Sequence, residues 1–380
     1  MTRSAIWPFV VALVFTLGGC VNSPSSSSAD DVSNTVPDSV ATKKTGLLIE
    51  PADALKLGYS IDWVTSLNVA GDRDLFAVEV LGDLLVTVER PTNVVTAVAM
   101  KDGKQLWRQQ AGQTPYRAFA PTRVDDRILV NTETQIFEFD TTKEGQLINR
   151  ADLASAVGAG PAMIGDVAVF GGSNGLIFGH DTRTGYARWR YKMPGQIVVA
   201  PQSSGQQVFV VGTDGQYNLF AGSGGEVLWR GKVFDKVTAT PAVHASGIYV
   251  ASEDHSLYAI NRSTGEDRWI FRYTDDLTKS PVVLQNTVYQ ALPSGELVAL
   301  KVTDGSELWR NKPDANLVGQ ISRGLIFQGG RSITLRDAGS GKLIDQIPSQ
   351  DELKFVIITE AKALIVIAKN GRIMKLSQLK

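Results

Sequence analysis

The residue types that most often do chemistry are few and scattered in this chain. Its three histidines are far apart, without the H-x-x-x-H kind of spacing that holds a metal: His180, His244 and His255. The one G-x-S-x-G string, Gly171-Gly-Ser-Asn-Gly175, falls in a turn of the repeat rather than in a nucleophile elbow, and the sequence has no phosphate-binding loop. Its Asp-Gly pairs are typical of turns rather than of catalytic acids. We therefore expect no catalytic site, no bound metal and no cofactor.

The chain has a single cysteine, Cys20, which follows a short apolar segment. Residues 5–17 are almost entirely apolar, too few for a comfortable membrane span and typical of a secretory signal. The ending Leu17-Gly-Gly-Cys20 resembles the lipobox of bacterial lipoproteins, where a diacylglycerol is attached to the cysteine before cleavage. We expect residues 1–19 to be a signal peptide and Cys20 to carry the lipid.

The residues after the cysteine predict how the protein is held. Serine-rich, low-complexity sequence follows, so residues 20–46 are expected to form the lipidated cysteine and a flexible tether. Val21 stands where an aspartate would favour the inner membrane, which favours anchoring in the outer membrane, facing the periplasm. The alternative is an ordinary secreted protein with a chance cysteine.

Overall charge excludes little except nucleic acid. The chain has 38 basic and 39 acidic residues and a formal net charge of −1, so no nucleic-acid partner is expected. One local group of basic residues near the C-terminal end leaves an anionic partner open: Arg323, Arg331, Arg336 and Lys342.

A fixed interval of 40 residues organises the rest of the chain. Five prolines keep it: Pro121, Pro161, Pro201, Pro241 and Pro281. Four tryptophans keep the same step: Trp189, Trp229, Trp269 and Trp309. A period near 40 built from short strands is typical of a β-propeller, in which one repeat is one four-stranded antiparallel blade.

Each repeat predicts four strands in order. Proline suits the first, innermost strand because it cannot donate to a central ladder. Alternating or β-branched runs follow, then a glycine turn, and the tryptophan falls four residues later on the outermost strand. Two units have Asn149 and Asp345 at the tryptophan position. We expect those two joints between blades to pack less aromatic area and to be looser.

The two ends of the propeller are expected to meet in one blade. After seven outer-strand positions, the chain continues through three strands with no fourth. A lone strand beginning at Tyr59 carries Trp63 at the missing outer position. It would complete the last blade and leave no open edge. We therefore predict an all-β, eight-bladed propeller over residues 47–380, preceded by a short helix at 50–57, with seven blades as the alternative.

The repeat ending Leu257-Tyr-Ala-Ile-Asn-Arg-Ser-Thr-Gly-Glu-Asp-Arg-Trp269 resembles PQQ-like propeller repeats. With the lipobox and the blade count, the whole chain resembles the BamB-like family of outer-membrane assembly lipoproteins. This resemblance implies a non-catalytic scaffold that binds the periplasmic domains of the central barrel-inserting subunit, with nascent outer-membrane proteins as further candidate partners.

The same resemblance implies that partner contacts come from connections between blades near the middle of the chain. Here those connections are shorter, lack the family's arginine and have Lys236 and Thr238 where the family has aspartates. The candidate partner-binding residues by position are Met193, Gln196, Ile197, Phe234 and Lys236. Ordinary loop packing is the alternative for each.

Two other functions remain open from the sequence. A periplasmic lipoprotein could bind a small molecule or glycan in the central channel. A PQQ-dependent dehydrogenase is less favoured, because those enzymes often use a vicinal disulfide and a calcium site, and this chain has one cysteine.

Overall fold

The structure is a computed structural model that describes residues 46–69 and 74–379. The expected signal peptide, Cys20 and nearly all of the expected tether lie outside the described residues. The described residues belong to one compact unit. Apart from helix α1 (Pro51–Leu57) and one turn of 3-10 helix at Thr141–Lys143, its regular elements are strands. The helix expected at residues 50–57 is present.

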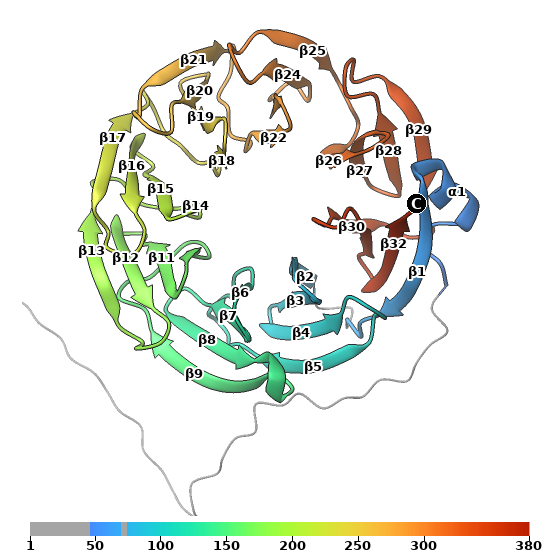
Figure 1. Cartoon of the computed structure of the whole chain (residues 1–380), viewed down its shortest axis with the longest axis horizontal. Helices are drawn as coiled ribbons and strands as arrows, with labels where there is room; N and C mark the ends of the chain where they lie inside the picture. Colours follow the sequence, from blue (N-terminus) through green and yellow to red (C-terminus); the bar gives the residue numbers. More distant parts are fainter. Residues whose placement is uncertain (1–45, 70–73, 380) are drawn as a thin grey trace, which may run out of the picture. The chain divides into compact units, whose positions relative to one another are not determined.

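The strands form eight four-stranded antiparallel sheets, which are the blades of a propeller arranged in a ring (Figure 1). Seven blades, A to G, each use four consecutive strands. Blades A to C are β2 (Asp74–Leu81), β3 (Leu84–Arg90), β4 (Val94–Ala99), β5 (Gln105–Gln110); β6 (Thr122–Val124), β7 (Arg127–Asn131), β8 (Gln135–Asp140), β9 (Gln146–Asp152); and β10 (Ala162–Ile164), β11 (Val167–Gly171), β12 (Leu176–Asp181), β13 (Ala187–Lys192).

The next four blades repeat the plan, with the first strand of each inside the ring and the last on its rim (Figure 1). Blades D and E are β14 (Gln202–Ser204), β15 (Gln207–Val211), β16 (Gln216–Ala221), β17 (Val227–Lys232); and β18 (Ala242–His244), β19 (Gly247–Ser252), β20 (Ser256–Ile260), β21 (Asp267–Arg272). Blades F and G are β22 (Val282–Leu284), β23 (Thr287–Ala291), β24 (Leu297–Lys301), β25 (Glu307–Asn311); and β26 (Asn316–Ile321), β27 (Gly324–Gly329), β28 (Ser332–Arg336), β29 (Leu343–Pro348).

Blade H joins the two ends of the described chain. Its inner strands are β30 (Leu353–Ile358), β31 (Leu364–Ala368) and β32 (Arg372–Gln378), and β1 (Tyr59–Ser66) is its outer strand. Strand β1 runs antiparallel to β32 and places Trp63 opposite Lys375. The prediction of eight blades closed by the N-terminal strand is confirmed.

A tryptophan on the outer strand of one blade packs against a turn glycine of the next. Gly265 has φ +77°, and a Cβ placed there would lie 2.7 Å from the Trp229 ring. The Trp229 indole N–H donates to the Arg262 carbonyl in the same turn at 2.9 Å. The same ring-over-glycine contact recurs at five other joints: Trp63–Gly103, Trp107–Gly145, Trp189–Gly225, Trp269–Gly305 and Trp309–Gly341. The interval of 40 therefore reflects contacts between blades as well as the length of a blade.

The joint between blades B and C has no such tryptophan, but the side chain of Arg127 bridges it. Arg127 on β7 donates to the buried Glu138 carboxylate at 2.6 Å and to the Thr182 carbonyl of blade C at 3.3 Å. Thr182 lies 33 residues after Asn149, just as Arg262 lies 33 residues after Trp229. The Thr182 carbonyl is therefore in the place of the carbonyl that accepts the indole N–H elsewhere, and here Arg127 donates to it. As expected, no tryptophan packs at this joint. The sequence did not indicate the polar contact made by Arg127.

The joint between blades G and H, where Asp345 replaces the tryptophan, is covered by helix α1. Ala54 and Leu57 of the helix are fully buried, in one hydrophobic cluster with Leu335 and Ile347 of blade G. Figure 1 shows α1 beside β29 and β1. Apolar side chains of the helix thus supply part of the burial that the missing indole would give.

The prolines lie just outside the strands predicted to contain them. Pro241, for example, directly precedes β18, and Pro281 directly precedes β22. The three-residue inner strands of blades B to F therefore begin after the residue that lacks an N–H donor, which accounts for their shortness.

Candidate functional site

The connections between blades all lie at one end of the ring, because an antiparallel sheet of four strands starts and finishes at the same end. We call this end the interblade face and the opposite end, which carries the turns between first and second strands, the hairpin face. Within the described part of the chain, the connections from blade A through to blade H are 111–121, 153–161, 193–201, 233–241, 273–281, 312–315 and 349–352.

The connection from blade C to blade D has alternating buried and exposed side chains. Met193 and Ile197 are each 1% exposed and pack in a hydrophobic cluster with Phe220. Gln196 and Val198 point outward, and Val198 is 39% exposed. Met193 and Ile197 therefore fix the connection by packing, while the residues beside them are available to a partner.

Backbone hydrogen bonds hold this connection to the hairpins on both sides. The Met193 N–H donates to the Gly175 carbonyl at 2.9 Å, and the Ile197 N–H donates to the Gly172 carbonyl at 3.1 Å. On the other side, the Thr213 N–H of blade D donates to the Gln196 carbonyl at 2.8 Å. The backbone that carries the exposed side chains is thus fixed before any partner arrives.

The next connection, from blade D to blade E, is tied in the same way. The Val233 N–H donates to the Gly215 carbonyl at 3.0 Å, and the Glu253 N–H donates to the Lys236 carbonyl at 2.9 Å. The Phe234 N–H also donates to the Asp254 carboxylate at 3.2 Å. Between these contacts, the Phe234 ring is 83% exposed and the Lys236 side chain is exposed as well.

Asp254 links this connection to the interior of blade E. Its carboxylate accepts both the Phe234 N–H and the Tyr258 hydroxyl. Burial, followed by the neighbouring Asp254, raises the pKa of Tyr258 to about 12. The phenol therefore stays a proton donor at neutral pH and fixes the carboxylate under Phe234.

Three of the five residues expected from the sequence are on the surface, and two are not. Gln196, Phe234 and Lys236 are exposed, whereas Met193 and Ile197 are buried. Val198 was missed, although alternation along the connection could have indicated it. We define the connection patch as the four exposed side chains: Gln196, Val198, Phe234 and Lys236.

The chemistry of the connection patch suits binding rather than catalysis. It combines an exposed aromatic ring, an aliphatic side chain, an ammonium group and an amide on a fixed backbone. Aromatic residues that become buried at the centre of an interface contribute most of the affinity. The four side chains include no carboxylate, imidazole or thiol.

The histidines lie apart and serve the fold. His180 is 1% exposed, and burial lowers its pKa below the usual 6.5. His244 shares a 2.8 Å hydrogen bond with Ser246, and His255 lies 3.3 Å from Asp276. Over residues 46–69 and 74–379, no three His, Cys, Asp or Glu side chains are grouped to hold a metal. No helix in these ranges is long and apolar enough to span a membrane.

Of the basic residues noted near the C-terminal end, Arg331 lies at one end of blade G, whereas Arg323, Arg336 and Lys342 lie toward the other end. Arg331 lies in the hairpin between β27 and β28 on the interblade face and donates to the Gln350 carbonyl. Arg323 lies between β26 and β27 on the hairpin face, and its side chain approaches Gly58. Arg336 bonds to the Gly341 carbonyl at 3.2 Å and lies over Phe327. Arg331 is thus separated from the other three residues, for which an anionic partner stays a prediction.

Known proteins resemble this chain both in sequence and in fold. A family model described as outer membrane protein assembly factor BamB matches residues 91–230 and 217–334, more than half of the chain. The outer membrane protein assembly factor BamB of Burkholderia pseudomallei (strain K96243) is 28% identical over 138 residues, 36% of this chain and 35% of that protein. The match therefore spans about a third of that relative's length.

Two solved structures share the fold. The crystal structure of BamB from Moraxella catarrhalis superposes with a TM-score of 0.65 at 18% identity, over 83% of this chain and 97% of that one. The computationally designed Ika8 protein superposes with a TM-score of 0.67 at 16% identity, over 84% of this chain and 99% of that one. At these identities the likeness concerns the fold alone.

Proposed function

The chain belongs to the family of outer membrane protein assembly factor BamB, and from that premise we propose that it is a non-catalytic scaffold. In this proposal the interblade face holds protein partners in the assembly and insertion of outer-membrane β-barrel proteins. The propeller supplies rigidity, and the side chains that vary between connections supply specificity.

The observation that carries the proposal is the exposure of Phe234 on a fixed backbone. A phenylalanine that is 83% exposed gains nothing for the fold from its ring. Burial of such a ring in a partner's pocket removes roughly 150–250 Å² of surface from water. Because the connection is already held by hydrogen bonds on both sides, binding does not have to order it.

We propose that the partner is the central barrel-inserting subunit, bound through its periplasmic domains, with nascent outer-membrane proteins as secondary partners. The names of the family and of the Burkholderia relative support this choice of process. Phe234 would be the apolar anchor, and Val198 of the preceding connection would be a second apolar contact. Gln196 and Lys236 would bond to polar groups at the rim.

We also propose that Cys20 anchors the propeller to the outer membrane, facing the periplasm. Residues 1–19 would be removed as a signal peptide, and residues 20–46 would be the tether. A lipid with two acyl chains suffices for stable membrane attachment, whereas one chain gives only marginal binding. Cys20→Ser should release the protein from washed membranes, and continued attachment of this variant would contradict the anchor.

The scaffold role is tested by recovering partners from the protein's own membranes. Affinity purification of the tagged protein should recover an outer-membrane barrel-assembly protein. Recovery should fall strongly for Phe234→Ala and stay unchanged for Tyr186→Ala, a matched loss of a 78% exposed ring on the hairpin face. Reproducible absence of any barrel-assembly protein, with the lipoprotein intact, would contradict the proposal.

A further inference from the structure

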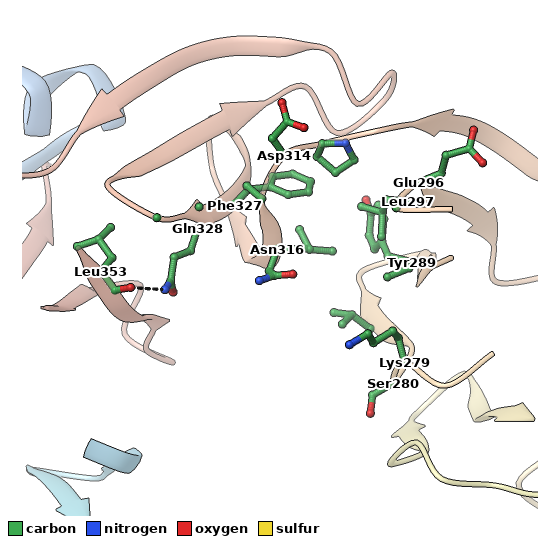
Figure 2. A pocket seen from close by; sticks show the side chains of 18 of the residues that line it. Lys279, Ser280, Tyr289, Glu296, Leu297, Asp314, Asn316, Phe327, Gln328 and Leu353 are labelled. Atoms are coloured by element: carbon green, nitrogen blue, oxygen red, sulfur yellow. Dashed lines mark hydrogen bonds between the residues drawn. The ribbon is translucent and has the colours of Figure 1, made fainter. Parts of the chain in front are cut away.

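A cavity of about 850 Å³ opens on the interblade face between blades F and G and reaches blade H. Its walls come from the end of connection 273–281, from β23 and β24, and from the start of β26 and β30. Gln328 closes it toward blade H by donating to the Leu353 and Lys354 carbonyls, at 3.3 and 3.0 Å (Figure 2). Pockets of 300–1,000 Å³ are the usual size for a bound ligand.

The cavity exists because the connection at this joint is short. The connections after blades C, D and E have nine residues, and each buries an apolar side chain at the same position of the repeat: Ile197, Val237 and Leu277. After blade F the connection is only residues 312–315, and the chain enters β26 at once. The equivalent position, Leu317, already belongs to that strand and is only partly buried.

Two prolines outside the 40-residue series remove hydrogen bonds that hold the other connections in place. Pro313 occupies the position of Met193 and Val233, whose N–H groups donate to the carbonyls of Gly175 and Gly215. Because proline has no N–H, the corresponding Gly295 carbonyl accepts no hydrogen bond from any described residue. Pro293 likewise stands where Glu253 donates to the preceding connection in blade E.

The mouth of the cavity carries polar groups that have no partner in the described structure. These are the solvent-exposed side chains of Lys279, Ser280, Asp314 and Asn316. Figure 2 shows Lys279 and Ser280 on the side of blade F, and Asn316 on the side of blade G. Tyr289 and Phe327 close the interior with apolar surface. The cavity thus offers donors and acceptors around an apolar interior.

The strand at the wall of the cavity adds an unpaired backbone edge. Strand β26 has six residues, Asn316 to Ile321, like β30 of blade H; the inner strands of blades B to F have three and β2 has eight. It pairs with β27 on one side and with no described strand on the other. None of its six residues is a proline, so each keeps its N–H group. An edge of this kind accepts an additional strand.

We propose that this cavity binds an extended polypeptide segment, which adds to the free edge of β26 and inserts one apolar side chain between blades F and G. Backbone hydrogen bonds to an edge strand give affinity, and pockets for alternate side chains give specificity. The unpartnered groups of both charges suit a peptide, whose backbone has both donors and acceptors. The site shares no residue with the connection patch and does not depend on the proposed function.

The test uses fluorescein-labelled decapeptides that alternate valine, phenylalanine or tyrosine with polar residues, screened as a library against the full-length protein. The structure predicts binders whose affinity falls about tenfold or more when alternate backbone nitrogens are methylated, because methylation removes the ladder donors. Ala315→Trp, which fills the cavity, should weaken the same peptides about tenfold or more. The matched control Ala154→Trp, on an exposed alanine of connection 153–161, should leave binding unchanged.

Lys279→Glu is a second variant, for use if Ala315→Trp fails to fold. It changes the charge at the mouth of the cavity without filling the cavity, and it should weaken peptide binding measurably. The proposal is overturned if no library peptide binds, or if N-methylated peptides bind as well as unmodified ones. It is equally overturned if Ala315→Trp and Ala154→Trp bind alike, or if neutral oligosaccharides occupy the cavity in place of peptides.

Discussion

Replacement of Arg127 by methionine should destabilise the joint between blades B and C by more than the loss of a surface ion pair would. The Arg127 side chain is 18% exposed and that of its partner Glu138 is 1% exposed, with 2.6 Å between Nη1 and the carboxylate. Removal of one member of such a pair leaves a buried charge without compensation, which costs roughly 3–5 kcal/mol. Asn149 still donates to Glu138 at 3.0 Å, so we expect the low end, about 3 kcal/mol.

Urea unfolding followed by tryptophan fluorescence measures this loss as a change in the free energy of unfolding. The double variant Arg127→Met/Glu138→Leu should recover most of it, because no charge then remains buried. Lys369→Met, which breaks an ion pair whose side chains are about half exposed, should cost less than about 1 kcal/mol. A loss below about 1 kcal/mol for Arg127→Met, or a double variant as unstable as the single one, would refute the assigned role.

Three further predictions concern other parts of the ring. Gly265→Ala should lower the free energy of unfolding by about 3 kcal/mol, because a Cβ would overlap the Trp229 ring. The control Gly185→Ala, at a similar φ of +76° but with no atom within 3.4 Å of the new Cβ, should lower it by about 1 kcal/mol. Equal losses in urea unfolding would contradict the ring-over-glycine contact. Because burial lowers the pKa of His180, the unfolded chain takes up a proton below pH 6.5 that the folded chain does not. The free energy of unfolding should therefore fall as the pH drops below 6.5. His180→Gln should reduce this dependence of the free energy of unfolding on pH. Phe234→Ala should change the free energy of unfolding by less than about 0.5 kcal/mol, since its ring is exposed; a larger loss in thermal unfolding would make Phe234 a structural residue.

The architecture could be predicted because it repeats. In each blade one tryptophan position, such as that of Trp229, indicates the outer strand. The strand that carries Trp63 could therefore be assigned as the outer strand of the last blade. The same signal could not show that Arg127 supplies a donor at the joint without a tryptophan. Arg127 lies two strands away from Asn149, and only the folded sheet brings its guanidinium to Thr182. The role of α1 at the other such joint was hidden for the same reason.

The candidate surface could be predicted only to the level of a connection. Sequence position indicated the segments that carry Gln196 and Phe234, but not which side of an irregular segment faces the core. Ile197 and Phe234 are both large and apolar, yet Ile197 is 1% exposed and Phe234 is 83% exposed. The cavity between blades F and G left a trace in the sequence, Pro313 and Pro293, whose meaning depends on the hydrogen bonds that equivalent residues make elsewhere.

Site-specific photo-crosslinking in living cells tests the central claim most directly. A photo-reactive amino acid is placed at Phe234 on the interblade face and, as the control, at Tyr186 on the hairpin face. The account predicts that position 234 crosslinks to an outer-membrane barrel-assembly protein and that position 186 does not. Crosslinking from position 186 alone, or from neither position with the protein correctly located, would contradict it.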